Sequence, residues 1–458
     1  MIIFTTFEEN IINMRLKYFK VSKLHGYLNK EIKFFDGVNL IVGINGSGKT
    51  SVLNMINWML TPDLGHLCIT HFKEAKLEFE YNKKQYVIKC WQDKDFLRYS
   101  ITLNETEYHP LEVKLIADNS SIRFGASREN LLQHYIGLRP ESKEVETWNL
   151  ISKLPSPKIV GLDRFAENFN RSFPYEIFRD EEGKRKDKFS SPIEGAKHMI
   201  RQYYIRTSYA ISELSTKLKT RLFLLTLQPI QSHTGKDPNS INIDTNIILD
   251  VENRINKIIE APEKFKFSAE ETNSIKRYFT FLKDMAHQQV QDEDNDSKLL
   301  YLVNAIQFAR ASEFLDEFEK FEKDSNRTLS KVNQFLVAVN SFIKDSAKEI
   351  YFDEKTSELL YRITNDNGKT IKEGLDVGYL SSGEQQLLIL FSYIAFNKGN
   401  SSLIIIDEPE LSLHIKWQEV FMKNLDLVRD SSTQIILATH SPILVNKKRS
   451  NVILLNSK

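Results

Sequence analysis

The sequence predicts an α/β protein in which the two ends of the chain build one domain around an inserted helical lobe. Residues 15–108 read mostly as strands, and residues 384–456 alternate between helix and strand. Between them, residues 196–347 carry Leu, Ile and Phe at three- and four-residue spacing, which is typical of helices. A chain of 458 residues is too long for one small core, so a large domain with an insertion is expected.

Composition excludes several classes of protein. Hydrophobic residues make up 41% and charged residues 27%, which is typical of a soluble globular protein. The net charge of +1 gives no global attraction to nucleic acid or membrane, so any basic surface must be local. Two cysteines, Cys68 and Cys90, argue against a disulfide framework and fit a reducing compartment. No apolar run reaches the roughly 18 residues of a membrane helix, so we expect a cytoplasmic protein with no membrane partner.

The start of the chain does not read as a signal peptide. Residues 1–13 lack a positively charged segment and contain Glu8 and Glu9. They form either a loose extension or a segment upstream of a native start at Met14.

A nucleotide-binding signal follows the first strands. Residues 38–43 are mostly apolar and end in glycine, as a buried parallel strand does, and a helix is expected over residues 49–60. Between them, Gly43-Ile-Asn-Gly-Ser-Gly-Lys-Thr50 matches the P-loop pattern in the required strand-to-helix context. Alternating residues at 77–81, 86–90 and 99–103 then predict a small antiparallel sheet.

The P-loop predicts a phosphate site for ATP. Its glycines let backbone N–H groups turn toward phosphate oxygens, and the helix N-terminus adds partial positive charge. Lys49 is expected to reach the β- and γ-phosphates and Thr50 to hold Mg²⁺. The complete predicted phosphate-binding set is Gly43, Asn45, Gly46, Ser47, Gly48, Lys49, Thr50 and Ser51.

An apolar strand over residues 403–406 ends in two acids, Asp407 and Glu408. A fully apolar strand is what a central parallel sheet requires. Asp407 is the predicted magnesium ligand, and Glu408 is the predicted base that orients the attacking water. A strand with solvated acids at its tip is the alternative, and the P-loop argues against it.

Leu380-Ser-Ser-Gly-Glu-Gln-Gln386 precedes a strongly apolar helix. Hydroxyl groups, free N–H groups and the helix dipole would form a second anion site here. An ordinary N-cap is the alternative. The position of the segment shortly before Asp407 favours the anion site, for which the predicted residues are Ser381, Ser382, Gly383 and Glu384.

His440 follows the next apolar strand, residues 434–437. A lone histidine is usually structural. At a strand tip beside a phosphate site it can hydrogen-bond the γ-phosphate, and its place as the fourth motif in order favours that role. The predicted catalytic set is Glu408, His440 and Lys49.

Together, the P-loop, the Leu-Ser-Ser-Gly-Glu signature, the Asp-Glu pair and the histidine resemble the motifs of ABC-type ATPases. The variant is similar to that of structural-maintenance-of-chromosomes (SMC), RecF and overcoming-lysogenization-defect (OLD) proteins. Residues 409–414, with Trp417 and Gln418, resemble the D-loop region of the OLD-like branch. The resemblance implies an ABC ATPase head with a mixed sheet, an antiparallel β subdomain and an inserted helical lobe.

The implied domains are residues 14–165 and 348–458 for the two halves of the head and 166–347 for the helical insertion. The resemblance also implies a head-to-tail dimer, and higher homo-oligomers are candidates. Ser381 and Gly383 of one copy would cap the γ-phosphate held by Lys49 of the other. A family Q-loop glutamine is missing at residues 161–164, and Gln92 is the other candidate.

Spacing separates this chain from two larger groups. Lys49 and Ser381 lie more than three hundred residues apart, whereas transporter ATPases carry the signature much closer. The helical region is interrupted, so it does not form the long coiled coil of chromosome-scale proteins. The chain ends 18 residues after His440, where OLD nucleases carry a catalytic acidic domain, so we expect a nuclease supplied in trans.

The layout resembles stand-alone ATPase subunits of antiphage systems such as PARIS and Septu, which pair an ATPase with a separate toxic effector nuclease. The alternatives are a RecF-like DNA repair ATPase, with nucleic acid as a partner, and a structural P-loop protein without turnover.

Three weaker sequence features have ordinary structural interpretations. His66, Cys68 and His71 are a weak metal pattern, and the basic runs 184–188 and 447–449 read as surface.

Overall fold

The computed structural model describes residues 14–116, 128–135, 137–161, 191–227, 252–255, 268–288, 295–365, 367–396, 402–446 and 451–455. The chain divides into two compact units. The first joins Met1–Tyr204 to Lys331–Lys458, and the second is Ile205–Ser330. The two ends of the chain therefore belong to one unit.

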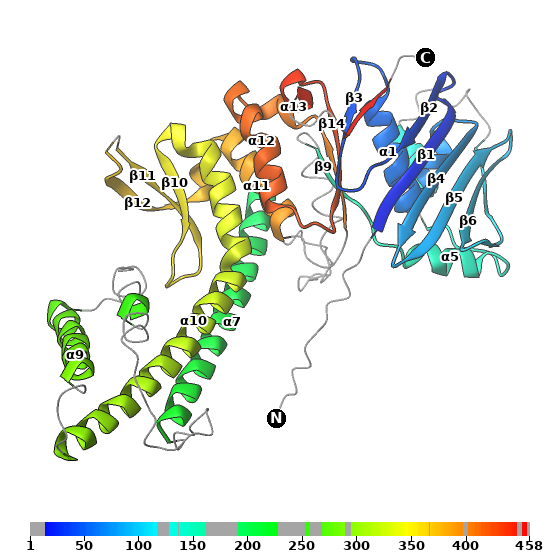
Figure 1. The fold of residues 1–458 in the computed structure, drawn as a ribbon. Helices are drawn as coiled ribbons and strands as arrows, with labels where there is room; N and C mark the ends of the chain where they lie inside the picture. The colour runs from blue at the N-terminus through cyan, green and yellow to red at the C-terminus, as the bar shows by residue number, and fades with distance from the viewer. Residues whose placement is uncertain are drawn as a thin grey trace, which may run out of the picture. The chain divides into compact units, whose positions relative to one another are not determined.

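A five-stranded sheet of parallel strands lies at the centre of the first unit (Figure 1). Its order is β15-β3-β14-β13-β9, so strands from the N-terminal and C-terminal parts of the chain are interleaved in one sheet. The side chains of β13 and β14 are almost entirely buried, because helices and a second sheet cover both faces. The strands are β3 (Val38–Val42), β9 (Lys158–Gly161), β13 (Leu403–Asp407), β14 (Gln434–Thr439) and β15 (Val452–Leu454).

A seven-stranded antiparallel sheet covers one side of this centre, with α1 (Lys49–Leu60) in the core between them. Its inward side chains alternate with exposed ones, as in β2, and pack on Val52 and Met55 of α1. Tyr99 donates a hydrogen bond to the Met59 carbonyl at 2.6 Å, which ties the sheet to the end of α1. The strands are β1 (Met14–Leu24), β2 (Leu28–Lys33), β4 (Glu74–Tyr81), β5 (Lys84–Gln92), β6 (Phe96–Leu103), β7 (Thr106–Glu107) and β8 (Leu111–Lys114).

A second hydrophobic cluster forms on the other face of the parallel sheet. It is built by α11 (Ser382–Phe396), α12 (Ile415–Val428), the first turns of α7 (Pro192–Leu227) and the last turns of α10 (Asn295–Ile343). A three-stranded antiparallel sheet joins it, formed by β10 (Lys348–Phe352), β11 (Leu359–Thr364) and β12 (Thr370–Asp376). Within the described residues, the other helices are α2 (Leu64–Ile69), α4 (Arg128–His134), α5 (Val145–Ser152), α9 (Ala269–Gln288) and α13 (Pro442–Asn446). The short 3₁₀ turns described there are η2 (Lys344–Ser346), η3 (Val377–Tyr379) and η4 (Pro409–Ser412).

The second unit contains α9, residues 205–227 of α7 and residues 295–330 of α10. Ion pairs join its segments: Arg221 contacts Glu317 at 2.8 Å, and Arg254 contacts Asp316 and Glu319 at 2.6 Å. Among the described helices, none combines the length and apolar character needed to cross a bilayer.

The predicted α/β class is confirmed, with a parallel central sheet, an antiparallel sheet and a helical region. The expected helix over residues 49–60 is α1. The sequence did not indicate α2, α5 or β12. The predicted boundary at residues 165–166, the alternative starts before Met14 and the basic runs 184–188 and 447–449 lie outside the described residues.

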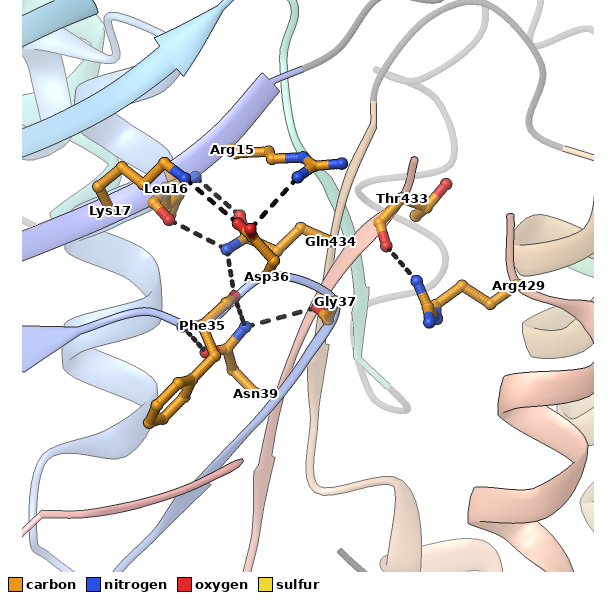
Figure 2. Close-up of polar contacts among 10 residues, drawn as sticks. All are labelled: Arg15, Leu16, Lys17, Phe35, Asp36, Gly37, Asn39, Arg429, Thr433 and Gln434. Atoms are coloured by element: carbon orange, nitrogen blue, oxygen red, sulfur yellow. Dashed lines mark hydrogen bonds and ion pairs between the residues drawn. The ribbon is translucent and has the colours of Figure 1, made fainter. Parts of the chain in front are cut away.

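The antiparallel sheet is joined to the parallel sheet by side chains rather than by strand pairing. β2 pairs with β1 only from Tyr18 onward, so the backbone at the start of β1 faces the ends of β13 and β14. Gln434 accepts from the Leu16 N–H at 2.7 Å and donates to the Leu16 and Phe35 carbonyls at 3.0 and 2.9 Å (Figure 2). Ser402 accepts from the Met14 N–H and donates to the Met14 carbonyl at 2.9 Å.

We call these contacts the seam, made of Met14, Leu16, Phe35, Ser402 and Gln434. Gln434 and Ser402 are buried, and the Met14 and Leu16 backbone groups that they satisfy would otherwise be desolvated without a partner. The seam thus fixes the N-terminal half of the unit to the C-terminal half.

Replacing Gln434 with leucine should therefore destabilise the first unit. The substitution keeps a buried side chain of similar size but leaves the Leu16 N–H and carbonyl unpaired, which costs about 3 kcal/mol. The Phe35 carbonyl keeps its hydrogen bond from the Asn39 amide at 2.9 Å. Thermal unfolding should show a clearly lower Tm. Gln85→Leu, on an exposed position of β5, is the control. Equal Tm values for the two variants would show that the seam does not stabilise the fold.

Candidate functional site

Three loops meet at one edge of the parallel sheet. The P-loop follows β3, Glu408 follows β13 and His440 follows β14, and these three strands are neighbours in the sheet. Because the strands are parallel, their carboxyl ends lie at the same edge, where ligands bind in open α/β sheets. The first and last parts of the chain therefore share one site.

The P-loop has the backbone that its glycines allow. Gly46 and Gly48 have φ values of +79° and +90°, which favour glycine. A methyl group on Gly43 would collide with the Ser47 hydroxyl and approach the Leu455 carbonyl to 3.0 Å. The Ser47 hydroxyl is buried and has no hydrogen-bond partner among the described residues. Asn45 is exposed, whereas Ser51 is half-buried at the start of α1.

Lys49 is 4% exposed, and its ammonium group donates to the Gly43 carbonyl at 3.0 Å. Burial lowers the pKa of Lys49 below the usual lysine value, while the nearby carboxylates act in the opposite direction. These carboxylates belong to Glu408, Asp407 and Glu410. Three acids thus surround one lysine, which leaves the site with an excess of negative charge.

Thr50 and Asp407, the predicted magnesium ligands, are in contact across the site. The Thr50 hydroxyl donates to Asp407 Oδ2 at 2.9 Å, although the residues are 357 positions apart. Mg²⁺ is usually held by one or two protein oxygens together with phosphate oxygens and water. A hydroxyl beside a carboxylate, next to two further acids, fits that ion.

His440 lies between the lysine and the predicted base. Its Nε2 is 2.5 Å from Lys49 Nζ and 3.0 Å from Glu408 Oε1. The Nε2 of a neutral imidazole can accept a hydrogen bond from the Lys49 ammonium or donate one to the Glu408 carboxylate, but not both. The Glu408 backbone has φ +50°, a left-handed conformation that is uncommon outside glycine and is typical of constrained functional sites. The predicted catalytic residues are therefore brought together.

Sequence reasoning did not identify Glu410, which holds His440. The His440 N–H comes just after the last residue of β14 and donates to Glu410 Oε1. A second link runs parallel to it: the Ser441 hydroxyl donates to Gln418 at 2.6 Å, and Gln418 donates to the Leu413 carbonyl at 3.0 Å. These contacts tie the loop after β13 to the loop after β14.

His25 is another residue that sequence reasoning missed. It lies in the turn between β1 and β2, and its Nε2 is 3.0 Å from the Ser51 hydroxyl. Leu28 of the same hairpin lies beside Gly48, where a methyl group would meet it at 3.0 Å. The β1–β2 hairpin therefore covers the start of α1. Only the folded chain reveals this, because the turn carries no recognisable motif.

The serines of the signature are exposed to solvent, whereas its glutamate is buried. Ser381 and Ser382 are exposed at the start of α11, and Gly383 is half-buried. Glu384 is 3% exposed, and its carboxylate points into its own subunit, toward Ser346, Lys348 and the Ser381 N–H. The signature therefore offers its serines outward, while its glutamate is engaged within the fold.

The weaker candidates have structural partners. Gln92 donates to the Leu67 and Thr70 carbonyls at 2.7 and 2.9 Å, so its amide closes a turn. Gly161 lies beside Asp407 at the same sheet edge, and residues 162–164 lie outside the described residues. His66 pairs with Asp63 at 2.7 Å, and burial raises the pKa of Cys68 to about 12. In the described part of the chain, no cluster of three His, Cys, Asp or Glu residues could hold a metal.

The chain matches the AAA ATPase domain family over residues 14–445. It belongs to this family. A retron Vc95 probable ATPase from Vibrio cholerae serotype O1 biovar El Tor is 30% identical over 145 residues, covering 29% of this chain and 28% of the relative. The DNA replication and repair protein RecF from Streptococcus gordonii is 24% identical over 202 residues, covering 44% of this chain and 48% of RecF. The chain thus spans less than half the length of either relative.

Two solved structures are also similar to this AAA ATPase family member. The Smc head domain with an extended coiled coil from Pyrococcus furiosus, bound to the C-terminal domain of ScpA, has 13% identity, covers 96% of this chain and 93% of that chain, and gives a TM-score of 0.37. The SMC head domain from Thermotoga maritima has 11% identity, 94% and 91% coverage, and a TM-score of 0.34. The family match confirms the predicted ATPase family.

Removing the Glu410 carboxylate should impair the site by displacing His440. In Glu410→Ala, the kcat for ATP hydrolysis should fall about a hundredfold, because small misplacements of catalytic groups have effects of this size. Glu410→Gln should keep most activity, since the glutamine oxygen can still accept from the His440 N–H. Glu419→Ala, at an exposed position of α12, is the control. Equal losses of kcat in the alanine and glutamine variants would show that the negative charge of Glu410, and not its hydrogen bond from the His440 N–H, is what activity requires.

Proposed function

We propose that this chain binds ATP with Mg²⁺, hydrolyses ATP, and closes as a head-to-tail pair of copies around two nucleotides. The observation that carries the proposal is the meeting of motifs from opposite ends of the chain. Thr50 contacts Asp407, while Lys49 and Glu408 both contact His440. Such a set of groups has no role in a purely structural P-loop protein.

Each residue has a separate task in this proposal. The backbone of residues 43–48 and the Lys49 ammonium hold the phosphates. Thr50 and Asp407 hold Mg²⁺, which neutralises charge on the phosphate oxygens. Glu408 orients the attacking water and accepts its proton. His440 donates a hydrogen bond to the transferred phosphoryl group.

Exposed surface beside the signature supports a second copy as the partner. Ser381 and Ser382 are exposed at the start of a 15-residue helix, where anions bind well. Large apolar side chains flank the motifs: Tyr379 is 81%, Leu411 67% and Ile415 62% exposed. Exposed apolar residues around polar groups are typical of interfaces, and a facing P-loop would cover them.

Glu408→Gln tests the proposal directly. Without a carboxylate to accept the proton, the variant should bind ATP but hydrolyse it at least about a hundredfold more slowly. Bound ATP should then lock the dimer. Light scattering coupled to size exclusion, with and without ATP and Mg²⁺, should show a shift from monomer to dimer.

Lys49→Ala and Ser381→Arg in the Glu408→Gln background serve as controls. The first should lose nucleotide binding, and the second should bind ATP without forming the dimer. If Glu408→Gln itself binds ATP and remains a single subunit, the proposal is contradicted.

At the level of biological role, we propose that the protein is the sensor and scaffold subunit of an antiphage system that controls a separate effector nuclease. The similarity to a retron probable ATPase supports this role. The resemblance of the layout to stand-alone ATPase subunits such as those of PARIS and Septu is consistent with it.

The second candidate is a RecF-like ATPase that clamps DNA, supported by the similarity to RecF. A row of lysines on the antiparallel sheet also favours an anionic partner. Lys20 lies opposite Lys76, and Lys76 lies opposite Lys89, on three neighbouring strands. Like charges in register destabilise a sheet, but ion pairs of Lys20 with Glu31 and of Lys76 with Glu78 offset part of this repulsion, so the similarity to RecF remains the main support for this candidate.

The two roles predict different partners. If the protein is a defence subunit, the product of an adjacent effector gene should co-purify with it, and both genes together should reduce phage growth. If it is a RecF-like clamp, duplex DNA should stimulate ATP hydrolysis, and the stimulation should fall steeply with salt. Stimulation by DNA without any co-purifying effector would overturn the defence role.

A further inference from the structure

The signature loop, residues 376–382, is held at both ends by lysines from outside it. At its first end, Lys197 of α7 donates to Asp376 Oδ2 at 2.8 Å. The other oxygen of Asp376 accepts from the Gly378 N–H at 2.6 Å, which closes the turn η3. Lys197 also donates to Glu194 at 2.9 Å, so α7 itself orients the lysine.

At its second end, the loop is held through Glu384. Lys348 of β10 donates to both carboxylate oxygens of Glu384, at 2.9 and 3.1 Å. The Ser346 hydroxyl donates to the same carboxylate at 2.9 Å, and the Ser381 N–H donates to it at 2.8 Å. The carboxylate therefore connects Lys348 to the backbone of the signature serine in one step.

Burial makes this connection depend on the lysine. Burial pushes the pKa of Glu384 upward, but the Lys348 ion pair and the Ser381 N–H outweigh that effect, and the pKa lies below its ordinary value. A buried carboxylate without its cation is strongly disfavoured and would become protonated or leave its position. Either change weakens the bond that fixes the Ser381 N–H.

Lys197 and Lys348 lie close to the two points where the chain enters and leaves the helical insertion. Lys197 lies in the first turns of α7, where the chain leads into the helical insertion. Lys348 begins β10, just after the end of α10, where the chain leads out of it. Both segments pack in the hydrophobic cluster that contains α11.

We propose that Lys197 and Lys348 are positioning residues that hold the signature loop in the shape that meets a nucleotide. The meeting itself rests on the function proposed above. The two ion pairs, both within the first unit, connect the first turns of α7 and the start of β10 to the signature loop.

Amide hydrogen exchange of the signature segment in the nucleotide-free protein tests the link itself. In Lys348→Met, exchange at Ser381 should become about tenfold faster, because its acceptor is lost. Lys348→Arg should retain slow exchange by keeping the charge. Lys348→Met with Glu384→Gln should also recover it, because a glutamine oxygen accepts from the Ser381 N–H without needing a cation. Lys372→Met, on an exposed position of β12, is the matched control. Unchanged exchange in Lys348→Met overturns the inference.

A second measurement separates positioning from general damage. In the Glu408→Gln background, Lys348→Met should bind a fluorescent ATP analogue with an affinity within about twofold of the parent, while ATP-driven dimerisation weakens about tenfold. A mere loss of stability would lower both. If Glu408→Gln itself forms no dimer, the proposed function fails, and the exchange experiment still decides this inference. If Lys348→Met dimerises as well as its parent, the inference fails and the proposed function stands.

Discussion

The bonding of Gln434 to the backbone of Leu16 and Phe35 is the constraint on which the arrangement of the site depends. Gln434 begins β14, and His440 follows the other end of the same strand, so one short rigid element connects the seam to the chemistry. Any movement of β1 relative to β14 would change the position of the β1–β2 hairpin over the start of α1. In the seam, the side chains of Gln434 and Ser402 form the hydrogen bonds to β1 that a neighbouring strand would otherwise form. These bonds join the parallel sheet to the antiparallel sheet.

Charge explains why this edge of the sheet requires a ligand. Asp407, Glu408 and Glu410 face one buried lysine, and two of these acids come from consecutive positions at the end of β13. A magnesium ion beside Thr50 and Asp407 and the phosphates beside Lys49 would complete the balance. The same acids oppose the lowering of the Lys49 pKa by burial.

The sequence was sufficient for residues whose role follows from local chemistry. The glycine spacing of residues 43–48 indicates the backbone conformation of a P-loop, and the apolar run that ends in Asp407 indicates a buried strand. Both features could therefore be predicted. Glu410, His25 and the direction of the Glu384 side chain could not, because each depends on a partner brought close only by the sheet order. β12 was missed for another reason: its residues are largely exposed and do not alternate between apolar and polar, so hydrophobic periodicity gives no signal. The predicted domain boundaries and residue roles stay predictions.

The signature helix shows how one helix start can serve two surfaces. Its first residues, Ser381 and Ser382, face outward, and the residue one turn later, Glu384, faces inward. A helix places residues three positions apart on nearly the same side, so Glu384 can reach back to the Ser381 N–H, as in a capping box. An isolated capping box would fix only the helix end. Here the same carboxylate also binds Lys348, so the helix end takes its position from the segment that leaves the insertion. The outward surface that a second copy would meet is therefore set by contacts on the inward surface.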